Sequence, residues 1–499
     1  MANQPGLETP LRWTGGYFRE PVWPREPDIA AVKSIARQHL QSQLPFAVDD
    51  EILEVSFFAE GLYNKLYKIS YPGHHPSYLL RVTVPVLPYL KTESEVATIA
   101  YLRANTSIPV PRVIAWQSNN VNELGYEWML MEVIDGVPLF KVWRKIPWEQ
   151  KLKLVDELAR HVKDMQDHSF DSIGALYFKT ALEHGKEQRI TATDHQVSTV
   201  DEVTKPKLEM QDADTDEASV STDFQTLQLH TSPSGSLEHA EGGLMTVATG
   251  SCSQHTLAND TQKDDFAIGP LFNSVFFVEN KSRLPGDRGP YPDQIKWLSE
   301  LINIQMELVK DVSIVDSDDF DDYIAKDAPL IISLGQEFLE ILPAVFGKEE
   351  GLPACCLHHS DLNLANILVD PETFDITGIV DWELVNVVPR WEADEYPEFM
   401  QSSEPFDDDE PPVPSYEDPE HPSVYTRDRW DNRLLRRHWD ETMERLRQGI
   451  DADADTATDT GNAEAKRKGL AVLYDLTENW IWVLNWMKKY KAGRNNSDD

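Results

Sequence analysis

Hydrophobic and polar residues follow a helical period at the start of the chain and then switch to alternation. The stretch "IAAVKSIARQHLQSQL" places apolar residues three and four apart, which predicts an amphipathic helix. From residue 51 onward, "ILEVSFFAEGLYNKLYKISY" and "YLLRVTV" alternate on either side of the turn "PGHHPS". This alternation predicts a meander of antiparallel strands.

A second helix and two further strands complete this first unit. The stretch "TESEVATIAYLRANT" predicts a helix, for which Thr92 is the expected N-cap. The stretches "IPVPRVIAW" and "YEWMLMEVI" predict strands that end near the turn dipeptide Asp135-Gly136. We therefore expect an N-terminal extension at 1–50 and a small lobe built around a sheet at 51–135.

The remainder of the chain, 136–499, is predicted to be mostly helical. Helical patterns occur in "WEQKLKLVDELARHVKDMQDHSF", "DQIKWLSELINIQMELVKDV" and "DAPLIISLGQEFLEILPAVF", and again around 428–449 and 467–491. A small antiparallel sheet followed by a large helical part is an α+β organisation.

Two polar stretches interrupt the helical part. Between about 181 and 265 there is one aromatic residue, Phe224, and there are 16 acidic residues against five basic ones. Such a segment cannot bury enough apolar surface to offset its ordering entropy, so we expect a disordered insertion. The tract "DADADTATDTGNAEA" predicts a solvated linker.

Charge and cysteine content narrow the possible partners and compartments. The chain has 46 basic and 85 acidic residues and a formal net charge of −39, which argues against nucleic acid or an anionic membrane as a non-specific partner. Of the three cysteines, Cys355 and Cys356 are neighbours in an apolar run, so a disulfide framework has no support and a reducing compartment is expected. No apolar run approaches the length expected of a membrane span.

Candidate chemistry is concentrated in "CCLHHSDLNLANILVDPETFDITGIVDWE", residues 355–383. Asp361 is followed five positions later by Asn366, and a predicted β-hairpin then leads to Asp381. Phosphoryl transfer to a hydroxyl needs one carboxylate for the hydroxyl proton and two further oxygen ligands for Mg²⁺. Asp361, Asn366 and Asp381 supply that set.

Two other interpretations of this stretch are weaker. A zinc site would use His358 and His359, but they are adjacent and no second pair of soft ligands follows at metal spacing. In a structural interpretation, Asp361 caps a turn and Asn366 satisfies local backbone groups. The spacing H-x-D-x-x-x-x-N, together with "IVDWE" after the next hairpin, favours phosphoryl transfer.

The same stretch resembles the aminoglycoside phosphotransferase family and its choline-kinase-like relatives. "HHSDLNLANILVD" and "ITGIVDWE" are similar to that family's H-x-D-x-x-x-x-N and I-[IV]-D-W-E motifs. Upstream, "AEGLYNKLYKI" and "MLMEVIDGVPL" resemble its nucleotide loop and hinge, and "RGPYPDQIKWL" is similar to its fungal branch. The resemblance implies a two-lobed protein-kinase-like α+β fold, with a small antiparallel-sheet N-lobe carrying an αC-type helix and a large, mostly helical C-lobe.

The resemblance also implies catalytic and metal-binding roles. Asp361 would be the catalytic base, and Asn366 and Asp381 would bind Mg²⁺. His359 would hold the loop by packing and hydrogen bonds.

Further roles concern ATP. Glu95 would pair with the cation of the third strand, Arg81, and Asn64 would approach the phosphates. Backbone groups of Glu132 and Ile134 would receive the adenine.

Two departures from protein kinases affect this interpretation. Arg81 stands where protein kinases have Lys, so the charge is kept but not the shape. Its fork can still bridge a phosphate and Glu95, although a strand Arg that merely extends to solvent is the alternative. In addition, "DWELVNVVPRWEADEYPEF" lacks the A-P-E that ends a protein-kinase activation segment, which favours a small-molecule acceptor.

The acceptor, the activity and the compartment remain expectations. Residues 391–426 contain twelve acids and no Lys or Arg, which favours an amine-bearing acceptor over an ordinary solvated loop only weakly. We expect an ATP- and Mg²⁺-dependent small-molecule phosphotransferase. The alternatives are a non-catalytic binding or regulatory protein and, less favoured, a protein kinase. The N-terminus resembles neither a signal nor a transit peptide, so we expect a cytoplasmic protein; a mitochondrial one is the alternative, because some fungal relatives are linked by name to mitochondrial inheritance.

Overall fold

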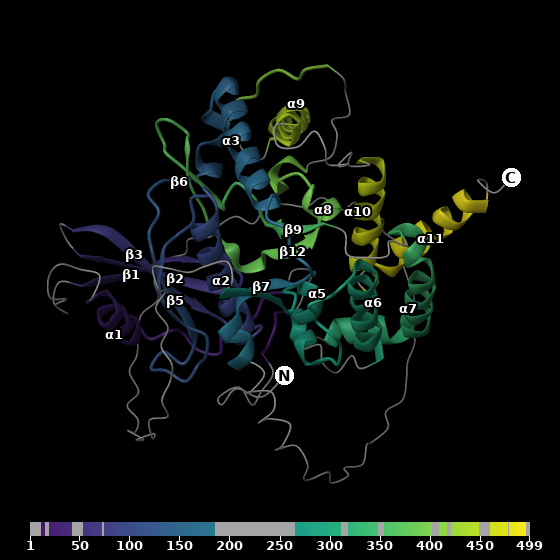
Figure 1. The fold of residues 1–499 in the computed structure, drawn as a ribbon, viewed down its shortest axis with the longest axis horizontal. Helices are drawn as coiled ribbons and strands as arrows, with labels where there is room; N and C mark the ends of the chain where they lie inside the picture. The colour runs from purple at the N-terminus through teal and green to yellow at the C-terminus, as the bar shows by residue number, and fades with distance from the viewer. Residues whose placement is uncertain are drawn as a thin grey trace, which may run out of the picture.

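The computed structural model describes residues 11–14, 19–41, 53–71, 74–184, 265–310, 318–347, 354–401, 409–416, 421–448, 460–477 and 479–495. These residues form a small lobe around one antiparallel sheet and a larger, mostly helical lobe beside it (Figure 1). The expected two-lobed α+β organisation, with a small antiparallel-sheet N-lobe and a large, mostly helical C-lobe, is confirmed.

The N-lobe contains a five-stranded antiparallel sheet with the strand order β1-β2-β3-β5-β4. The strands are β1 (Glu54–Glu60), β2 (Asn64–Tyr71), β3 (His74–Thr83), β4 (Val113–Gln117) and β5 (Glu127–Glu132). The predicted strands are therefore present. The turn between the second and third strands is shorter than expected, because β3 already begins at His74.

Two helices pack on opposite faces of this sheet. Helix α1 (Ile29–Leu40) buries Val32 and Leu40 against a cluster that includes Leu80 and Trp128. Helix α2 (Leu90–Asn105) lies on the other face, which turns toward the C-lobe. Paired strand residues alternate between the two faces, so each face has its own apolar layer.

The predicted N-cap of α2 is wrong. The helix begins at Leu90 and its N-cap is Tyr89, so Thr92 lies within the first turn. The Thr92 hydroxyl instead donates a hydrogen bond to the Glu127 carboxylate at 2.6 Å, and Glu127 also accepts from the Tyr89 backbone N–H. Because these partners come from β5, the start of α2 was decided by a tertiary contact that local sequence does not reveal.

Residues assigned to the N-terminal extension pack against the N-lobe. Lys65 pairs with Glu26 at 2.6 Å and lies over the Trp23 ring at 5.0 Å. Leu11 and Trp13 join an apolar cluster that also contains residues of both lobes, among them Tyr63 and Phe277. The described part of 1–50 therefore contributes to the core that joins the lobes.

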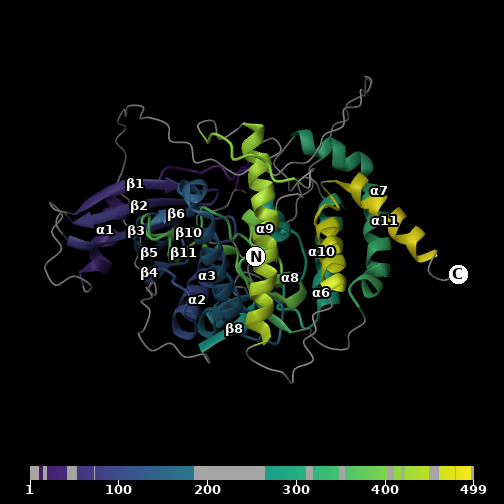
Figure 2. The same ribbon diagram turned by 90° about the horizontal axis from the view of Figure 1, so that it is seen from above.

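The C-lobe is mostly helical (Figure 2), with short strands before and after residues 359–366. Strand β10 pairs with β11 as the predicted hairpin and with β6, β9 pairs with β12, and β7 pairs with β8. Its elements are β6 (Val137–Pro138), η1 (Leu139–Lys141), η2 (Trp143–Lys145), α3 (Trp148–Gln166), β7 (Ala175–Phe178), β8 (Phe266–Gly269), α5 (Ser274–Phe277), η4 (Val278–Arg283), α6 (Gln294–Lys310), α7 (Asp318–Val345), β9 (Cys355–His358), β10 (Ile367–Val369), β11 (Ile376–Ile379), η6 (Trp382–Leu384), β12 (Asn386–Pro389), α8 (Arg390–Ala393), η7 (Glu398–Met400), α9 (Pro422–Gln448), α10 (Thr460–Tyr474) and α11 (Trp480–Asn495).

Three expectations about the C-lobe need comment. The predicted insertion at 181–265 lies almost wholly outside the described residues, although 181–184 are helical. The predicted linker at 451–465 is wrong in its second half, because α10 starts at Thr460. The helical stretch predicted at 467–491 is two helices, since α10 ends at Tyr474 and α11 begins at Trp480.

One helical segment changes the expectation about membrane spans. By length and composition alone, Lys326–Val345 of α7 is long and apolar enough to cross a membrane, with 20 residues and a mean hydropathy of 1.4. The sequence-based statement that no stretch approaches this length is therefore wrong. In the structure, Ile331, Phe338 and Leu342 of this segment belong to the C-lobe core.

Candidate active site

The loop after β9 presents Asp361 between two asparagines. Asn363 donates its side-chain amide to Asp361 Oδ1 at 2.7 Å, and Asn366 donates to Asp361 Oδ2 at 2.9 Å. Asn363 Oδ1 in turn accepts from the Ala365 backbone N–H at 2.8 Å, which closes the turn locally. Burial raises the pKa of Asp361, while the two amides oppose that rise. The result is a fixed and still ionisable carboxylate.

His359 holds this loop against the following hairpin. Its ring is buried, its Nε2 lies 3.2 Å from the Val380 carbonyl, and it packs edge-on to Trp382 at 4.8 Å. Burial lowers the pKa of His359 to about 4. A histidine that stays neutral near pH 7 and donates to a carbonyl is suited to packing and hydrogen bonding rather than to proton transfer.

Asp381 follows β11 in the left-handed region of the backbone, with φ 65° and ψ 58°. Desolvation and the neighbouring Glu383 carboxylate raise the pKa of Asp381, and Arg81 opposes the rise. A strained backbone and a carboxylate whose charge is disfavoured by its surroundings, both at one position, are typical of a functional residue.

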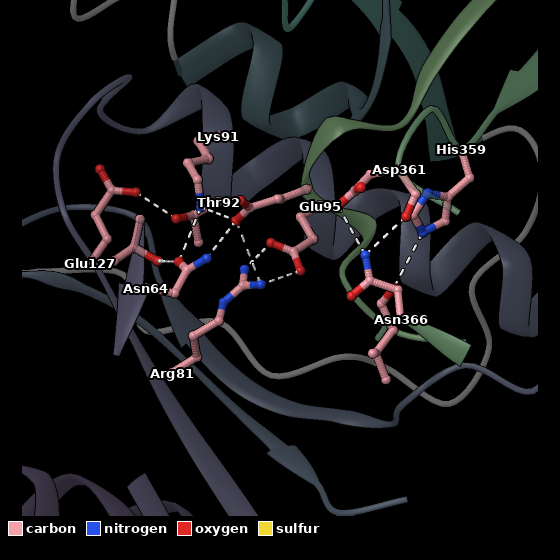
Figure 3. Close-up of polar contacts among 12 residues, drawn as sticks. Asn64, Arg81, Lys91, Thr92, Glu95, Glu127, His359, Asp361 and Asn366 are labelled. Atoms are coloured by element: carbon pink, nitrogen blue, oxygen red, sulfur yellow. Dashed lines mark hydrogen bonds and ion pairs between the residues drawn. The ribbon is translucent and has the colours of Figure 1, made fainter. Parts of the chain in front are cut away.

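The predicted pair of the N-lobe cation and the helix carboxylate is present. Both terminal nitrogens of the Arg81 guanidinium donate to the two oxygens of Glu95, one of them at 2.6 Å (Figure 3). The side chains of Arg81 and Glu95 are buried. The arginine fork thus makes a bidentate contact that a lysine could not make.

Two charged residues that sequence reasoning did not single out, Glu383 and Lys91, lie next to this pair together with Asn64. Glu383 accepts from Lys91 Nζ and from Asn64 Nδ2, the latter at 2.7 Å, and its carboxylate is 3.8 Å from Arg81. Asn64 Oδ1 also accepts from Thr83 Oγ1 at 2.9 Å. Glu383 was visible in the "DWE" motif, but nothing local marked Lys91, because its partners are distant in sequence.

The Asn64 side chain is therefore buried in a network of hydrogen bonds. Its amide oxygen accepts from Thr83 and Lys91, and its amide nitrogen donates to Glu383. In Figure 3 it lies beside Arg81 and Lys91, at the N-lobe side of the group.

The hinge follows β5. The Glu132 N–H donates to the Arg112 carbonyl at 3.0 Å, and the Glu132 carboxylate pairs with Arg112 at 2.6 Å. Ile134 packs closely over Gly378 of β11, where a Cβ would come within 2.7 Å of its side chain.

A small hollow, partly open to solvent, lies beside the end of β9 and the loop that carries Asp361. Its lining includes His358 of β9, Ser360 of that loop, and Glu395, Tyr396 and Glu398 of the acidic stretch. Burial and the nearby Asp361 charge raise the pKa of Glu398. Part of the acidic stretch at 391–426 is thus brought next to Asp361.

The chain is similar to known phosphotransferases and fungal proteins. Residues 54–227, about a third of the chain, match the model of the phosphotransferase enzyme family. A subtelomeric hrmA-associated cluster protein of Aspergillus fumigatus is 25% identical over 365 residues, which cover 72% of this chain and 64% of that protein. The family match confirms the resemblance found in the sequence, although it ends before the catalytic loop.

Two further comparisons extend the picture. Altered inheritance of mitochondria protein 9, mitochondrial, of Saccharomyces cerevisiae is 25% identical over 155 residues, which cover 29% of this chain and 24% of that protein. The match therefore spans less than two thirds of the length of each of these curated relatives. Among solved structures, the ethanolamine kinase of Plasmodium vivax is similar with a TM-score of 0.41 and 12% identity, covering 91% of this chain and 81% of that one.

Proposed function

We propose that this chain, whose residues 54–227 match the phosphotransferase enzyme family, transfers the γ-phosphate of ATP to a hydroxyl of a small molecule in a Mg²⁺-dependent reaction. The observation that carries the proposal is the arrangement of Asp361. Its carboxylate is held by Asn363 and Asn366, and its negative charge contributes to raising the pKa of Asp381, a rise that the positive charge of Arg81 in the N-lobe opposes.

Asp361 is the proposed catalytic base. It accepts the proton of the acceptor hydroxyl as the hydroxyl oxygen bonds to the γ-phosphorus and the bond to the ADP oxygen breaks. Burial raises the pKa of Asp361, so its carboxylate is a stronger base than a free Asp. The two asparagine amides keep it oriented and charged.

The donor set fits a magnesium ion. The carboxylate of Asp381 lies beside the negative charges of Glu383 and Asp361, which raise its pKa. Asn366 uses its amide nitrogen for Asp361, which leaves its amide oxygen as a second ligand. A divalent cation held by Asn366 and Asp381 would offset this local excess of negative charge and neutralise the charge on the phosphates.

The N-lobe residues are proposed to bind the nucleotide. Arg81, positioned by Glu95, supplies positive charge toward the phosphates, and Asn64 lies next to it. The Glu132 carbonyl and the backbone of Ile134 receive the adenine at the hinge. This assignment uses the carbonyl of Glu132 and not its N–H, which is already bonded to Arg112.

The acceptor is proposed to be a hydroxylated small molecule with an amine. Glu395 and Glu398 line the hollow beside Ser360, close to the proposed base. Carboxylates there favour a cation and steer it toward Asp361. Transfer to neutral sugars or alcohols with no preference for amines would remove this part of the proposal.

A non-catalytic nucleotide-binding protein is the second candidate. Arg81 replaces the lysine of protein kinases, and both of its terminal nitrogens donate to Glu95. Because these donors are already used, Arg81 would bind the phosphates only weakly. The two candidates differ in one outcome, because a regulator of this kind binds ATP without transferring phosphate to any acceptor.

The test begins with calorimetry of ATP binding, with and without Mg²⁺, on the parent and on Asp381→Ala. We expect binding in the parent that depends on Mg²⁺ and weakens strongly in the variant. A panel of hydroxylated amines is then assayed for ADP release, with Asp361→Asn as the inactive control. ATP binding without turnover over the panel would favour the second candidate, and no binding in the parent would remove both.

The site of action is proposed to be the cytoplasm, with the mitochondrion as the alternative. The yeast relative is named a mitochondrial protein, which supports the alternative. Fractionation of cells that carry the tagged full chain separates the two.

A further inference from the structure

Lys91 is a buried cation at the centre of the candidate site. It lies on the first turn of α2, is 1% exposed, and donates through Nζ to Glu383 and, at 3.2 Å, to Asn64. A buried ammonium group is costly unless it is paired and hydrogen-bonded, so this arrangement requires both partners.

Lys91 and its two partners come from three separate parts of the fold. Asn64 begins β2 directly after the loop between the first two strands, and Glu383 lies in η6 of the C-lobe. Lys91 itself belongs to α2, four residues before Glu95, so both side chains lie on one face of the helix, one turn apart. Helix α2 is therefore joined to β3 through Arg81 and to the C-lobe through Glu383.

The C-lobe end of this connection is the segment that carries Asp381. Glu383 is two residues past Asp381, whose left-handed backbone persists only if the surrounding structure holds it. Two N-lobe donors, Lys91 and Asn64, hold Glu383. Fixing Glu383 fixes the turn at Asp381, because only Trp382 separates them.

We propose that Lys91 is a positioning residue of the metal–phosphate site: through Glu383 and Asn64 it couples helix α2 and the nucleotide loop to the turn that carries Asp381. This inference rests on the proposed function and adds a residue to it. Removing Lys91 loosens the turn at Asp381, which weakens binding of the magnesium–triphosphate part of the nucleotide. The adenosine part, bound at the hinge, is unaffected.

The test compares adenosine with Mg·ATP by calorimetry on the full chain. Lys91→Gln keeps one hydrogen-bond donor for Glu383 but removes the charge. We expect its affinity for Mg·ATP to fall about 10- to 100-fold, the usual effect of losing a residue that orients a metal ligand. Its affinity for adenosine should stay that of the parent, and the Mg²⁺ concentration for half-saturation with ATP should rise.

Two variants keep a merely structural role distinguishable. Lys151→Gln is the matched control, since Lys151 is also a buried helix lysine with an acidic partner, Asp431, but belongs to α3 of the C-lobe and, in the described part of the chain, pairs with neither Glu383 nor Asn64. It should lose stability without losing Mg·ATP affinity. Lys91→Arg keeps the positive charge opposite Glu383, so it should fold even if Lys91→Gln does not. It should bind Mg·ATP more tightly than Lys91→Gln does. If Lys91→Gln does not fold, Lys91→Arg should bind Mg·ATP nearly as tightly as the parent.

The outcomes distinguish a failure of the Lys91 positioning role from a failure of the proposed function. Equal losses of adenosine and Mg·ATP affinity in Lys91→Gln, or no loss of either, overturn the positioning role while the parent still binds Mg·ATP. If Lys91→Gln does not fold, a Lys91→Arg protein that loses adenosine and Mg·ATP equally overturns it. A parent that binds adenosine but not Mg·ATP removes the proposed function and this inference together.

Discussion

Asn366 donates its side-chain amide to two oxygens of Asp361, the backbone carbonyl and carboxylate Oδ2, both at 2.9 Å. One side chain thus ties the proposed base to the start of the hairpin that leads to Asp381 (Figure 3). The proposed base, Asp361, and one proposed metal ligand, Asn366, are therefore fixed to each other. A substitution of Asp361 should affect proton transfer, and a substitution of Asn366 should affect Mg²⁺ binding.

Asp361→Asn should abolish the base while sparing nucleotide binding. We expect the turnover number to fall by about 10²–10⁴, the usual contribution of general base catalysis, with the affinity for Mg·ATP changed little. Asp375→Asn, an exposed residue of the following hairpin, is the control and should keep full activity. Steady-state kinetics and calorimetry on both variants check this, and an Asp361→Asn protein as active as the parent would contradict the role.

Asp381→Asn should stabilise the unliganded protein and weaken its ligand binding. Desolvation and Glu383 raise the pKa of Asp381, so its negative charge is unfavourable in the folded chain without a cation. Removing that charge should raise the unfolding temperature by a few degrees and reduce Mg·ATP affinity at the same time. Thermal melts with and without Mg·ATP measure both, and a variant less stable than the parent without ligand would refute the electrostatic argument.

Arg81→Met should destabilise the N-lobe strongly. It leaves the buried Glu95 carboxylate without its bidentate partner, and breaking a buried ion pair on one side costs about 3–5 kcal/mol. Arg81→Met combined with Glu95→Leu should recover much of that loss, because neither charge then remains unpaired. Urea unfolding of the single and double variants provides the comparison. Equal stability of Arg81→Met and the parent would show that the pair contributes little.

His359 should make the protein less stable in mild acid. Burial lowers the pKa of His359 from 6.5 to about 4, so below pH 6.5 the unfolded chain binds a proton that the folded chain does not. The free energy of unfolding is therefore highest above pH 6.5. It falls progressively as the pH drops toward 4, by up to about 3 kcal/mol from this histidine.

The non-titrating variant His359→Asn isolates this effect. Its amide can still donate to the Val380 carbonyl, so the fold should be kept. Urea midpoints at pH 7 and pH 4.5 should differ less for the variant than for the parent. The same pH dependence in both proteins would assign the acid sensitivity to other groups.

Much of the fold could be predicted from local pattern. Alternation over β1, β2 and β3 and the helical period of α2 and α3 identified these elements, because each buries one side of a periodic structure. Boundaries failed where a long-range contact decides them. Thr92 resembles a helix cap in sequence but donates to Glu127 of β5, and the acidic tract after 451 becomes helical at Thr460.

The sequence by itself determined three central residues of the candidate site, Asp361, Asn366 and Asp381. The spacing of Asp361, Asn366 and Asp381 around a hairpin is a local property, since a short loop and a tight turn hold them together whatever surrounds them. The resemblance to the phosphotransferase family follows from the same residues and from the nucleotide-loop and hinge segments.

Only the tertiary structure decided how the two lobes are joined. Lys91 and Glu383 are 292 positions apart, and neither residue type indicates a partner in the sequence. Their pairing arises because folding buries both charges in the same part of the protein interior, where each is stable only beside the other. For the same reason Asn64 proved to be a buried link between the lobes, which its position near the nucleotide loop could not reveal.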